Sequence, residues 1–243
     1  MDIEATVLVL LCHQPTKEGA PRAFVSGLGS AIACLVEWRL LECALEDLDG
    51  WRGPRVLSPA STDVAWAQHV TARPVRIMPQ EGPTFGERLT RVDMALRAAG
   101  AKRILFVRPG APTLDESYLV RAASALAGDT TVIGQTLDGG IALIGSSCPW
   151  PPTDTLPWER SSLGARLALA CRRAGQRVEF LSPLPAVAKP DDFGMCRGRL
   201  AGDARPARKR LVELLSALAT PAAQSDVLAT AGVRLPDVGT PRS

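Results

Sequence analysis

The sequence predicts an α/β protein with a mostly parallel β-sheet that is covered by helices on both faces. Two observations support this fold class. Short apolar segments bounded by turn residues alternate along the chain with longer segments of helical periodicity. One of the short segments, residues 104–107, is apolar at every position, which is typical of a central strand buried on both faces.

The predicted elements follow one another in the order that such a sheet requires. Predicted strands cover residues 6–12, 55–58, 75–78, 104–107, 132–133, 141–144 and 178–181. Predicted helices cover residues 30–48, 63–69, 85–99, 118–126, 161–174 and 207–218. Long loops are expected at residues 13–29, 148–156 and 182–194. We expect one domain over residues 1–220, followed by a C-terminal helix and a flexible tail over residues 221–243.

Two helix starts carry the spacing of a capping box, in which a Ser or Thr is followed three residues later by Glu. Thr84 with Glu87 and Thr113 with Glu116 both have this spacing. Glu87 is therefore expected to serve the cap rather than a ligand. The basic residues at 205–210 are predicted to form a solvated helix start.

Composition excludes several classes of protein. The net charge of +3 is too small, and the basic residues too scattered, for a nucleic-acid-binding protein. No segment approaches the roughly 20 apolar residues of a membrane span. The six cysteines contain no C-x-x-C pair, so neither a zinc site nor a disulfide scaffold is predicted. These features favour a cytoplasmic location.

The candidate ligand site lies in loops that follow the predicted strands. Arg108 and Gly110 follow the strand at 104–107, at the sheet edge where open α/β proteins bind ligands. Asp138, before Gly139 and Gly140, has two interpretations. Its carboxylate could face a ligand that the glycines allow to approach, or it could bond its own backbone in a tight turn.

A second candidate region is the junction between the strand at 75–78 and the helix that follows it. Gln80, Gly82 and Arg88 lie there, where the free amides of a helix N-terminus can bind an anion. The alternative is a capped helix with Arg88 on its surface. His13, which ends the first strand, is interpreted as a polar strand-end residue, with ligand contact as the alternative.

Three stretches resemble a known family. Residues 80–89 read Gln-Glu-Gly-Pro-Thr-Phe-Gly-Glu-Arg-Leu, residues 104–114 form the strand with its Pro- and Gly-containing loop, and residues 132–145 read Val-Ile-Gly-Gln-Thr-Leu-Asp-Gly-Gly-Ile-Ala-Leu-Ile-Gly. In this order they resemble the bacterial DUF2064 family of glycosyltransferase-like, selenodomain-associated transferases. The resemblance implies the GT-A fold of the nucleotide-diphosphosugar transferase superfamily.

The chain departs from the family where charged groups are expected. The family's basic triplet after the first strand aligns with residues 21–23, of which only Arg22 is basic. The family's acidic residue after the central strand aligns with Gly110, and a later pair of carboxylates aligns with Ala186 and Ala188. Of the implied acidic positions only Asp138 remains. The family implies a divalent metal as cofactor, yet these losses predict that no metal site is present.

The resemblance, taken with these departures, implies a nucleotide or nucleotide-sugar site with Asp138 as the catalytic candidate. The residues expected to bind the ligand are Arg22, Gln80, Gly82, Arg88, Arg108, Gly110, Gly139, Gly140 and Lys189. Arg108 and Lys189 lie in the loops that lost acid, and a guanidinium can match phosphate geometry in place of a metal. The alternative is that both are solvated charges at loop edges.

Three functions stay open from the sequence. The first is a transferase that acts on a nucleotide or nucleotide sugar, and the second is a catalytically inactive scaffold or partner-binding protein on the same fold. The third is a nucleotidyltransferase. A small molecule is the expected partner, without nucleic acid or a membrane span, and a homo-oligomer or protein partner is left open.

Overall fold

The computed structural model describes residues 3–153, 156–158 and 162–219. These residues form a seven-stranded sheet with the order β3-β2-β1-β4-β6-β5-β7. The strands are β1 (Thr6–Leu11), β2 (Arg55–Ser58), β3 (Arg76–Ile77), β4 (Arg103–Val107), β5 (Thr130–Thr136), β6 (Ile141–Ser146) and β7 (Arg177–Leu184). Only β6 runs antiparallel to its neighbours β4 and β5. The predicted mostly parallel sheet is therefore confirmed.

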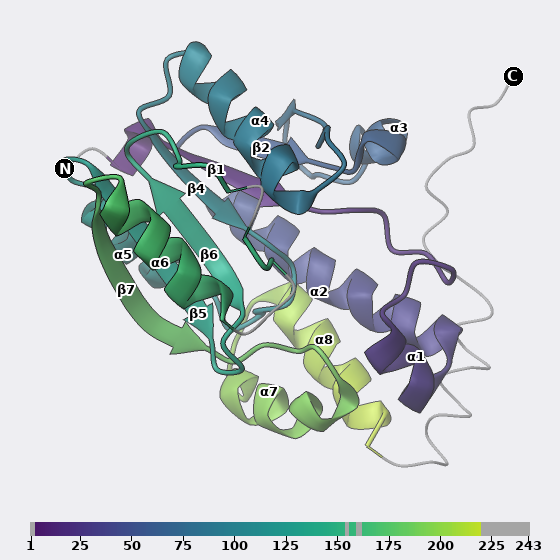
Figure 1. The fold of residues 1–243 in the computed structure, drawn as a ribbon. Helices are drawn as coiled ribbons and strands as arrows, with labels where there is room; N and C mark the ends of the chain where they lie inside the picture. Colours follow the sequence, from purple (N-terminus) through teal and green to yellow (C-terminus); the bar gives the residue numbers. More distant parts are fainter. Residues whose placement is uncertain (1–2, 154–155, 159–161, 220–243) are drawn as a thin grey trace, which may run out of the picture.

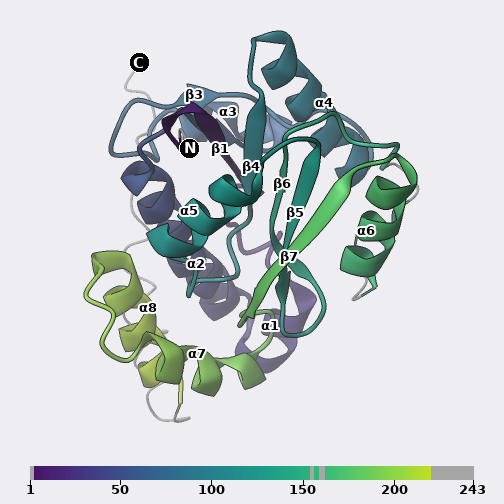
Figure 2. The same cartoon turned by 90° about the vertical axis from the view of Figure 1, so that its left-hand side faces the viewer.

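Eight α-helices are present in the described part of the chain. They are α1 (Arg22–Leu28), α2 (Ser30–Gly50), α3 (Val64–Ala67), α4 (Phe85–Ala98), α5 (Glu116–Ala125), α6 (Leu163–Arg173), α7 (Phe193–Leu200) and α8 (Pro206–Ala217). Helices α4 and α6 cover one face of the sheet, and α2 and α5 cover the other (Figures 1 and 2). No helix among the described residues is both long enough and apolar enough to cross a membrane.

Three apolar clusters hold these layers together. The cluster between the sheet and α2 and α5 contains Leu8, Leu41 and Leu119, all at most 2% exposed. The cluster under α4 and α6 contains Leu89 and Leu167, both fully buried. Strands β1 and β4 contribute alternate side chains to the two clusters, since successive side chains of a strand point to opposite faces.

The third cluster lies beyond the sheet, where α1, α7 and α8 pack on α2. Figure 1 shows α7 and α8 below the sheet. Phe24 of α1 packs on Phe193 of α7, with ring centroids 6.1 Å apart. Helix α1 lies in the predicted loop at residues 13–29, so that prediction is wrong there. Helix α7 begins at the end of the predicted loop at residues 182–194, and no helix was predicted for it.

Several boundaries also differ from the prediction. The cap of α5 is Asp115, whose carboxylate accepts from the Tyr118 amide at 2.7 Å, rather than the predicted Thr113. Strand β7 extends to Leu184, into the predicted loop. The cap at Thr84 is confirmed, because its hydroxyl accepts from the Glu87 amide at 3.2 Å. The predicted C-terminal helix and tail lie outside the described residues.

The predicted solvated cluster at residues 205–210 is wrong for its central member. Arg208 is 0% exposed and donates to the carboxylates of Glu46 and Asp47 on α2. It also donates to the main-chain carbonyls of Cys43, Pro112 and Leu114. A buried guanidinium needs such partners, because an unpaired charge in the interior is very costly.

Candidate functional site

The loops singled out in the sequence meet at one edge of the sheet. The amide of Arg108, after β4, donates to the carbonyl of Ala142 at the start of β6, at 3.4 Å. Leu137 of the β5–β6 turn donates to Leu184 at the end of β7, at 2.9 Å. The carboxyl ends of β1, β4, β5 and β7 therefore share this edge, as parallel pairing requires.

One pocket of about 380 Å³ opens at this edge, between the ends of β1 and β2 and the start of α4. We call it the Gln80 pocket. Its lining includes His13, Gln80, Gly82, Phe85, Arg88 and Arg108. Four of the residues that the sequence proposed for ligand binding are thus brought together here: Gln80, Gly82, Arg88 and Arg108.

Gln80 has a structural task within this pocket. Its side-chain amide donates to the carbonyls of Cys12 at 3.0 Å and Ser58 at 2.7 Å, which joins the ends of β1 and β2. Only its carbonyl oxygen is left to accept from a ligand. Gly82 has φ of +132°, a conformation that side-chain-bearing residues rarely adopt, and a Cβ there would lie 3.1 Å from the Cβ of Glu87 in the first turn of α4.

An aromatic ring lies between the two arginines of the pocket. The guanidinium carbon of Arg108 lies 5.0 Å from the centroid of Phe85, and that of Arg88 lies 5.8 Å from it. Arg88 also donates to the carbonyl of Gly82 at 3.4 Å. Phe85 in turn packs on Trp158, with centroids 4.9 Å apart. The ring therefore holds two cationic groups at one side of the pocket.

The first turn of α4 is fixed from behind by the segment that follows β6. The Thr153 hydroxyl donates to the Gly86 carbonyl at 3.2 Å, and the Trp158 indole donates to the Thr153 carbonyl at 3.0 Å. Trp158 packs against the apolar cluster under α4. The position of Phe85, and with it the two arginines, depends on this packing.

A second pocket of about 470 Å³ lies on the other side of Arg108, and we call it the Glu37 pocket. Its walls include Phe24, Leu40, Leu41 and Val187, and Glu37 of α2 is its one acidic lining residue. The two pockets share Leu11, His13 and Arg108. They are therefore two halves of one cleft.

His13 and Glu37 form a pair at the junction of the pockets. His13 Nε2 lies 3.5 Å from Glu37 Oε1, and the two side chains are 57% and 12% exposed. The hydrogen bond to Glu37 raises the pKa of His13 above its usual value. Burial opposes this rise in pKa, Asp63 adds to it and Arg108 lowers the pKa again.

The residues near Gly110 do not fit a divalent metal. The amide of Val187 donates to the Gly110 carbonyl at 2.8 Å, so the loop after β4 and the loop after β7 are neighbours. Gly110 and Ala188 both line the Glu37 pocket and carry no ligand atom in their side chains. Within the described ranges, no three His, Cys, Asp or Glu side chains gather in a metal-binding arrangement.

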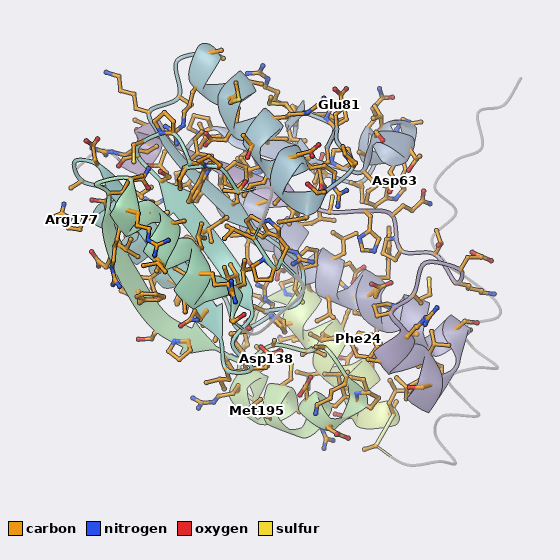
Figure 3. The ribbon with its side chains drawn as sticks, in the orientation of Figure 1. Phe24, Asp63, Glu81, Asp138, Arg177 and Met195 are labelled. Carbon is orange, nitrogen blue, oxygen red and sulfur yellow. The ribbon has the colours of Figure 1, made fainter. Side chains whose placement is uncertain are left out.

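Asp138 is engaged in its own turn. It is exposed, and its Oδ1 accepts hydrogen bonds from the Thr136 hydroxyl and, at 3.3 Å, from the Gly140 amide. Figure 3 shows Asp138 at the tip of the β5–β6 turn, near α7. These bonds correspond to the turn interpretation, with Gly139 at φ of +86°. A catalytic role for Asp138, and ligand binding by Gly139 and Gly140, stay predictions.

The other two basic candidates are peripheral. Arg22 is exposed on the first turn of α1, next to Pro21, which lines the Glu37 pocket. Lys189 is exposed and lies 3.6 Å from Asp191. The position of Lys189 corresponds to the solvated alternative, and phosphate binding by either residue stays a prediction.

Sequence reasoning missed Glu37 and Phe85 as site residues. Glu37 lies inside a long amphipathic helix, where a single acidic residue carries no motif. Phe85 was counted only as part of the apolar stripe of α4. A signal for Phe85 was present nonetheless, because it precedes Arg88 by three residues, a spacing at which helical side chains are neighbours.

Comparisons with known proteins bear on the family and the fold. The sequence model of DUF2064, described as an uncharacterized protein conserved in bacteria, matches residues 48–158. This match confirms the resemblance to DUF2064 that the motifs predicted. No curated protein matches the chain significantly.

Solved structures share the fold at low sequence identity. A candidate nucleotide-diphospho-sugar transferase from Desulfovibrio desulfuricans G20 is 18% identical with a TM-score of 0.78, covering 88% of this chain and 96% of its own. A nucleotidyl transferase from Methanothermobacter is 17% identical with a TM-score of 0.50, covering 80% and 97%. The bifunctional IspDF of Campylobacter jejuni is 11% identical with a TM-score of 0.52, covering 78% of this chain and 53% of its own. The nucleotide-diphosphosugar transferase fold is thereby shown.

Proposed function

We propose that this protein is a transferase-like protein that binds a nucleoside diphosphate in the Gln80 pocket, either free or as part of a nucleotide sugar. The observation that carries the proposal is the placement of Arg88 and Arg108 against the Phe85 ring at one side of that pocket. Guanidinium groups bind phosphate oxygens through paired, charge-assisted hydrogen bonds. Two of them supply the charge that a diphosphate requires.

The location of the pocket supports the same ligand. It lies at the carboxyl edge of the parallel strands, between the ends of β1 and β2, where open α/β folds bind nucleotides. The side-chain oxygen that Gln80 leaves free suits a base that is read by hydrogen bonds. The neighbours of similar fold are themselves described as nucleotide-sugar or nucleotidyl transferases.

Charge neutralisation by arginine is the distinctive part of this proposal. A transferase must stabilise the diphosphate as it leaves, and preorganised positive groups in a pocket can do so. Because the side chains near Gly110 offer no carboxylate cluster, no step of the proposed chemistry passes through a metal. Arg108 belongs to both pockets, so it could contact the diphosphate at the point where a transferred group leaves it.

A second function is favoured by one specific observation. Asp138 is the acidic residue that remains of the family pattern. Its carboxylate accepts hydrogen bonds from within its own β5–β6 turn. A protein that binds a nucleotide sugar without transferring the sugar would need the arginines and not a carboxylate. This scaffold function and the transferase function share the binding site and differ in turnover.

The experiment is a thermal-shift screen of UDP-, GDP-, CDP- and ADP-glucose in the presence of EDTA, because a ligand that binds the native state stabilises it by mass action. We expect at least one of them to raise the melting temperature of the wild type. The rise should be lost in Arg108→Ala and kept in Arg121→Ala. Arg121 is the matched control, since it lies 5.5 Å from the Tyr118 ring, far from either pocket.

The products then separate the functions. Release of a nucleoside diphosphate identifies sugar transfer, release of pyrophosphate from a nucleoside triphosphate identifies nucleotidyl transfer, and binding without either product identifies the scaffold. Stabilisation by none of the four nucleotide sugars would contradict the proposed site.

A further inference from the structure

We propose that His13 is the base that removes the proton from an alcohol bound in the Glu37 pocket, and that Glu37 holds the imidazole in place for this task. The inference rests on the proposed nucleotide-sugar site and names its acceptor side. It starts from the way the cleft is divided. One half carries the arginines, the other half is walled by apolar side chains, and His13 lies where the two halves meet.

The pairing of His13 with Glu37 fixes which ring nitrogen can act. Nε2 faces the Glu37 carboxylate at 3.5 Å, so in the neutral ring this nitrogen carries the hydrogen. Nδ1 is then the basic nitrogen. A base that is oriented by a buried carboxylate is the arrangement that general-base catalysis requires, and such contacts are commonly long before the substrate binds.

Glu37 is suited to orient the ring rather than to bind a metal or a distant cation. Its side chain is 12% exposed, and its Oε2 has no hydrogen-bond partner among the described residues. A carboxylate at this distance favours the protonated imidazole, and the hydrogen bond from His13 holds the ring against Glu37.

The other acidic group near His13 is already occupied. Asp63 Oδ2 accepts from the Gln14 amide at 2.7 Å, and its Oδ1 accepts from the Thr62 hydroxyl at 2.9 Å. Figure 3 shows Asp63 beside α3 and Phe24 on α1, and the loop that carries His13 runs between these two helices. Three charged groups thus face His13: Glu37 from α2, Asp63 from η2 (Ser61–Asp63), and Arg108 from the loop after β4.

The walls of the Glu37 pocket indicate the class of acceptor. Phe24, Leu40, Leu41, Val187 and several prolines surround a volume of about 470 Å³. The polar lining groups His13, Glu37 and Arg108 lie on the side that meets the Gln80 pocket, so an alcohol with an apolar body gains from burial against the other walls. Its hydroxyl would be the group directed at the junction, toward His13.

The chemical step balances without a further reactant. The alcohol oxygen forms a bond to the anomeric carbon of the donor sugar while its proton passes to His13 Nδ1. The bond between that carbon and the diphosphate oxygen breaks, and the nucleoside diphosphate leaves with the electron pair toward Arg108. His13 then returns the proton to water.

The first test uses the fact that the chain has two histidines, His13 and His69. With labelled histidine rings, an NMR titration gives two signals, and the signal that disappears in His69→Gln identifies the other as His13. We expect the pKa of His13 to fall clearly in Glu37→Gln, because the main stabiliser of the imidazolium is removed. The matched variant Asp63→Asn should lower it less. An unchanged His13 pKa in Glu37→Gln would overturn the pairing, whatever the outcome of the donor screen.

The second test measures nucleoside diphosphate release from the donor identified in the thermal-shift screen, with 2-phenylethanol as the acceptor probe. His13→Gln should lower kcat by about 10²–10⁴-fold, the usual worth of a general base. The donor should still stabilise this variant, because Arg88 and Arg108 remain in place. The matched variant His69→Gln should leave kcat unchanged. The rate should rise with pH to a plateau, and Glu37→Gln should move that rise to lower pH.

The outcomes separate this inference from the proposed function. A donor that binds but is not turned over faster with 2-phenylethanol than with the hydroxyl-free ethylbenzene would overturn the acceptor assignment and leave the nucleotide site standing. A His13→Gln variant with nearly wild-type kcat would overturn the base assignment. Failure of every nucleotide sugar to bind would contradict the proposed function, while the NMR arm would still decide the His13–Glu37 pairing.

Discussion

Arg208 of α8 is fully buried and donates through its terminal nitrogen to the Asp47 carboxylate of α2. All five N–H groups of a guanidinium can donate, and this one also reaches the carbonyls of Pro112 and Leu114, each at 3.1 Å. Those two residues continue the loop that carries Arg108 and Gly110. One side chain therefore ties α8 and α2 to the loop at the centre of the candidate site.

We predict that Arg208→Ala lowers the free energy of unfolding by about 3–5 kcal/mol, because it leaves Asp47 and Glu46 without their buried partner. Chemical denaturation monitored by circular dichroism measures the change. Arg210→Ala is the control. Arg210 is 44% exposed and lies 3.3 Å from Glu42, so its loss should cost less than about 1 kcal/mol. Equal costs for the two variants would contradict the assignment of the buried network.

A second prediction compares two glycines at the second position of two helices. A Cβ at Gly86 of α4 would lie 2.5 Å from the Thr153 carbonyl oxygen and 2.7 Å from the Trp158 indole nitrogen. Gly86→Ala should therefore lower the free energy of unfolding by about 1–3 kcal/mol through overpacking. A Cβ at Gly194 of α7 meets nothing within 4 Å, so Gly194→Ala should raise stability by up to about 1 kcal/mol.

Thermal melts of both variants in one buffer provide the comparison. Because the two positions are equivalent within their helices, propensity alone would shift both in the same direction. Opposite shifts would support the close contact of α4 with Thr153 and Trp158. A stabilising Gly86→Ala would show that this contact is looser than described. The placement of Phe85, which precedes Gly86, would then be in question as well.

The third prediction concerns acid. Hydrogen bonds from Arg205 lower the pKa of Asp203 below its ordinary value of 3.8, and the shortest of them measures 2.7 Å. The stabilisation from this pair is therefore fully present above pH 3.8 and is lost as the pH falls through the lower pKa of the folded state. We expect Asp203→Asn to lower stability by about 1 kcal/mol near neutral pH.

Urea denaturation of the wild type and Asp203→Asn over a falling pH series checks this. The gap between the two proteins should narrow as the pH falls below about 4 and Asp203 becomes protonated. A gap that stays constant into this range would mean that the carboxylate charge does not contribute.

The turn at Asp138 gives a fourth prediction. Asp138→Ala removes the acceptor of the Thr136 and Gly140 bonds and should cost about 0.5–1.5 kcal/mol. Asp138→Asn keeps an oxygen at the same place and should restore most of that stability. If Asp138→Asn instead keeps full stability but abolishes nucleoside diphosphate release, the residue is catalytic, as the family pattern implied.

Sequence reasoning predicted the elements with strong apolar periodicity and missed those without it. Strand β2 and helix α2 were predicted at or near their observed bounds, since each buries a regular set of apolar side chains. Helix α1 has seven residues and begins after a proline, so it carries too few periods to be recognised. Helix α7 contains Gly194 and Gly198, which weaken any helical signal.

Charges were harder to place than apolar residues, for a physical reason. The environment of Arg208 is set by Asp47, which is 161 positions away in the sequence, so no local pattern could predict its burial. The sequence could predict that the loop with Arg108 and Gly110 lies beside the loops after the other parallel strands. Parallel strands bring their carboxyl ends to one edge of the sheet. The Glu37 pocket could not, because it needs the packing of α1 on α2.

The central claim is that arginine, rather than a carboxylate-bound metal, neutralises the diphosphate. The most direct measurement is calorimetric titration, in EDTA, of the nucleotide sugar that gives the largest thermal shift in the screen into the wild type, Arg108→Ala and Arg121→Ala. We predict unchanged affinity of the wild type when EDTA is present. Arg108→Ala should bind about 10–100-fold more weakly, the worth of a charged hydrogen bond, and Arg121→Ala should bind normally. Affinity that collapses in EDTA, or that is equal in Arg108→Ala and Arg121→Ala, would contradict the claim.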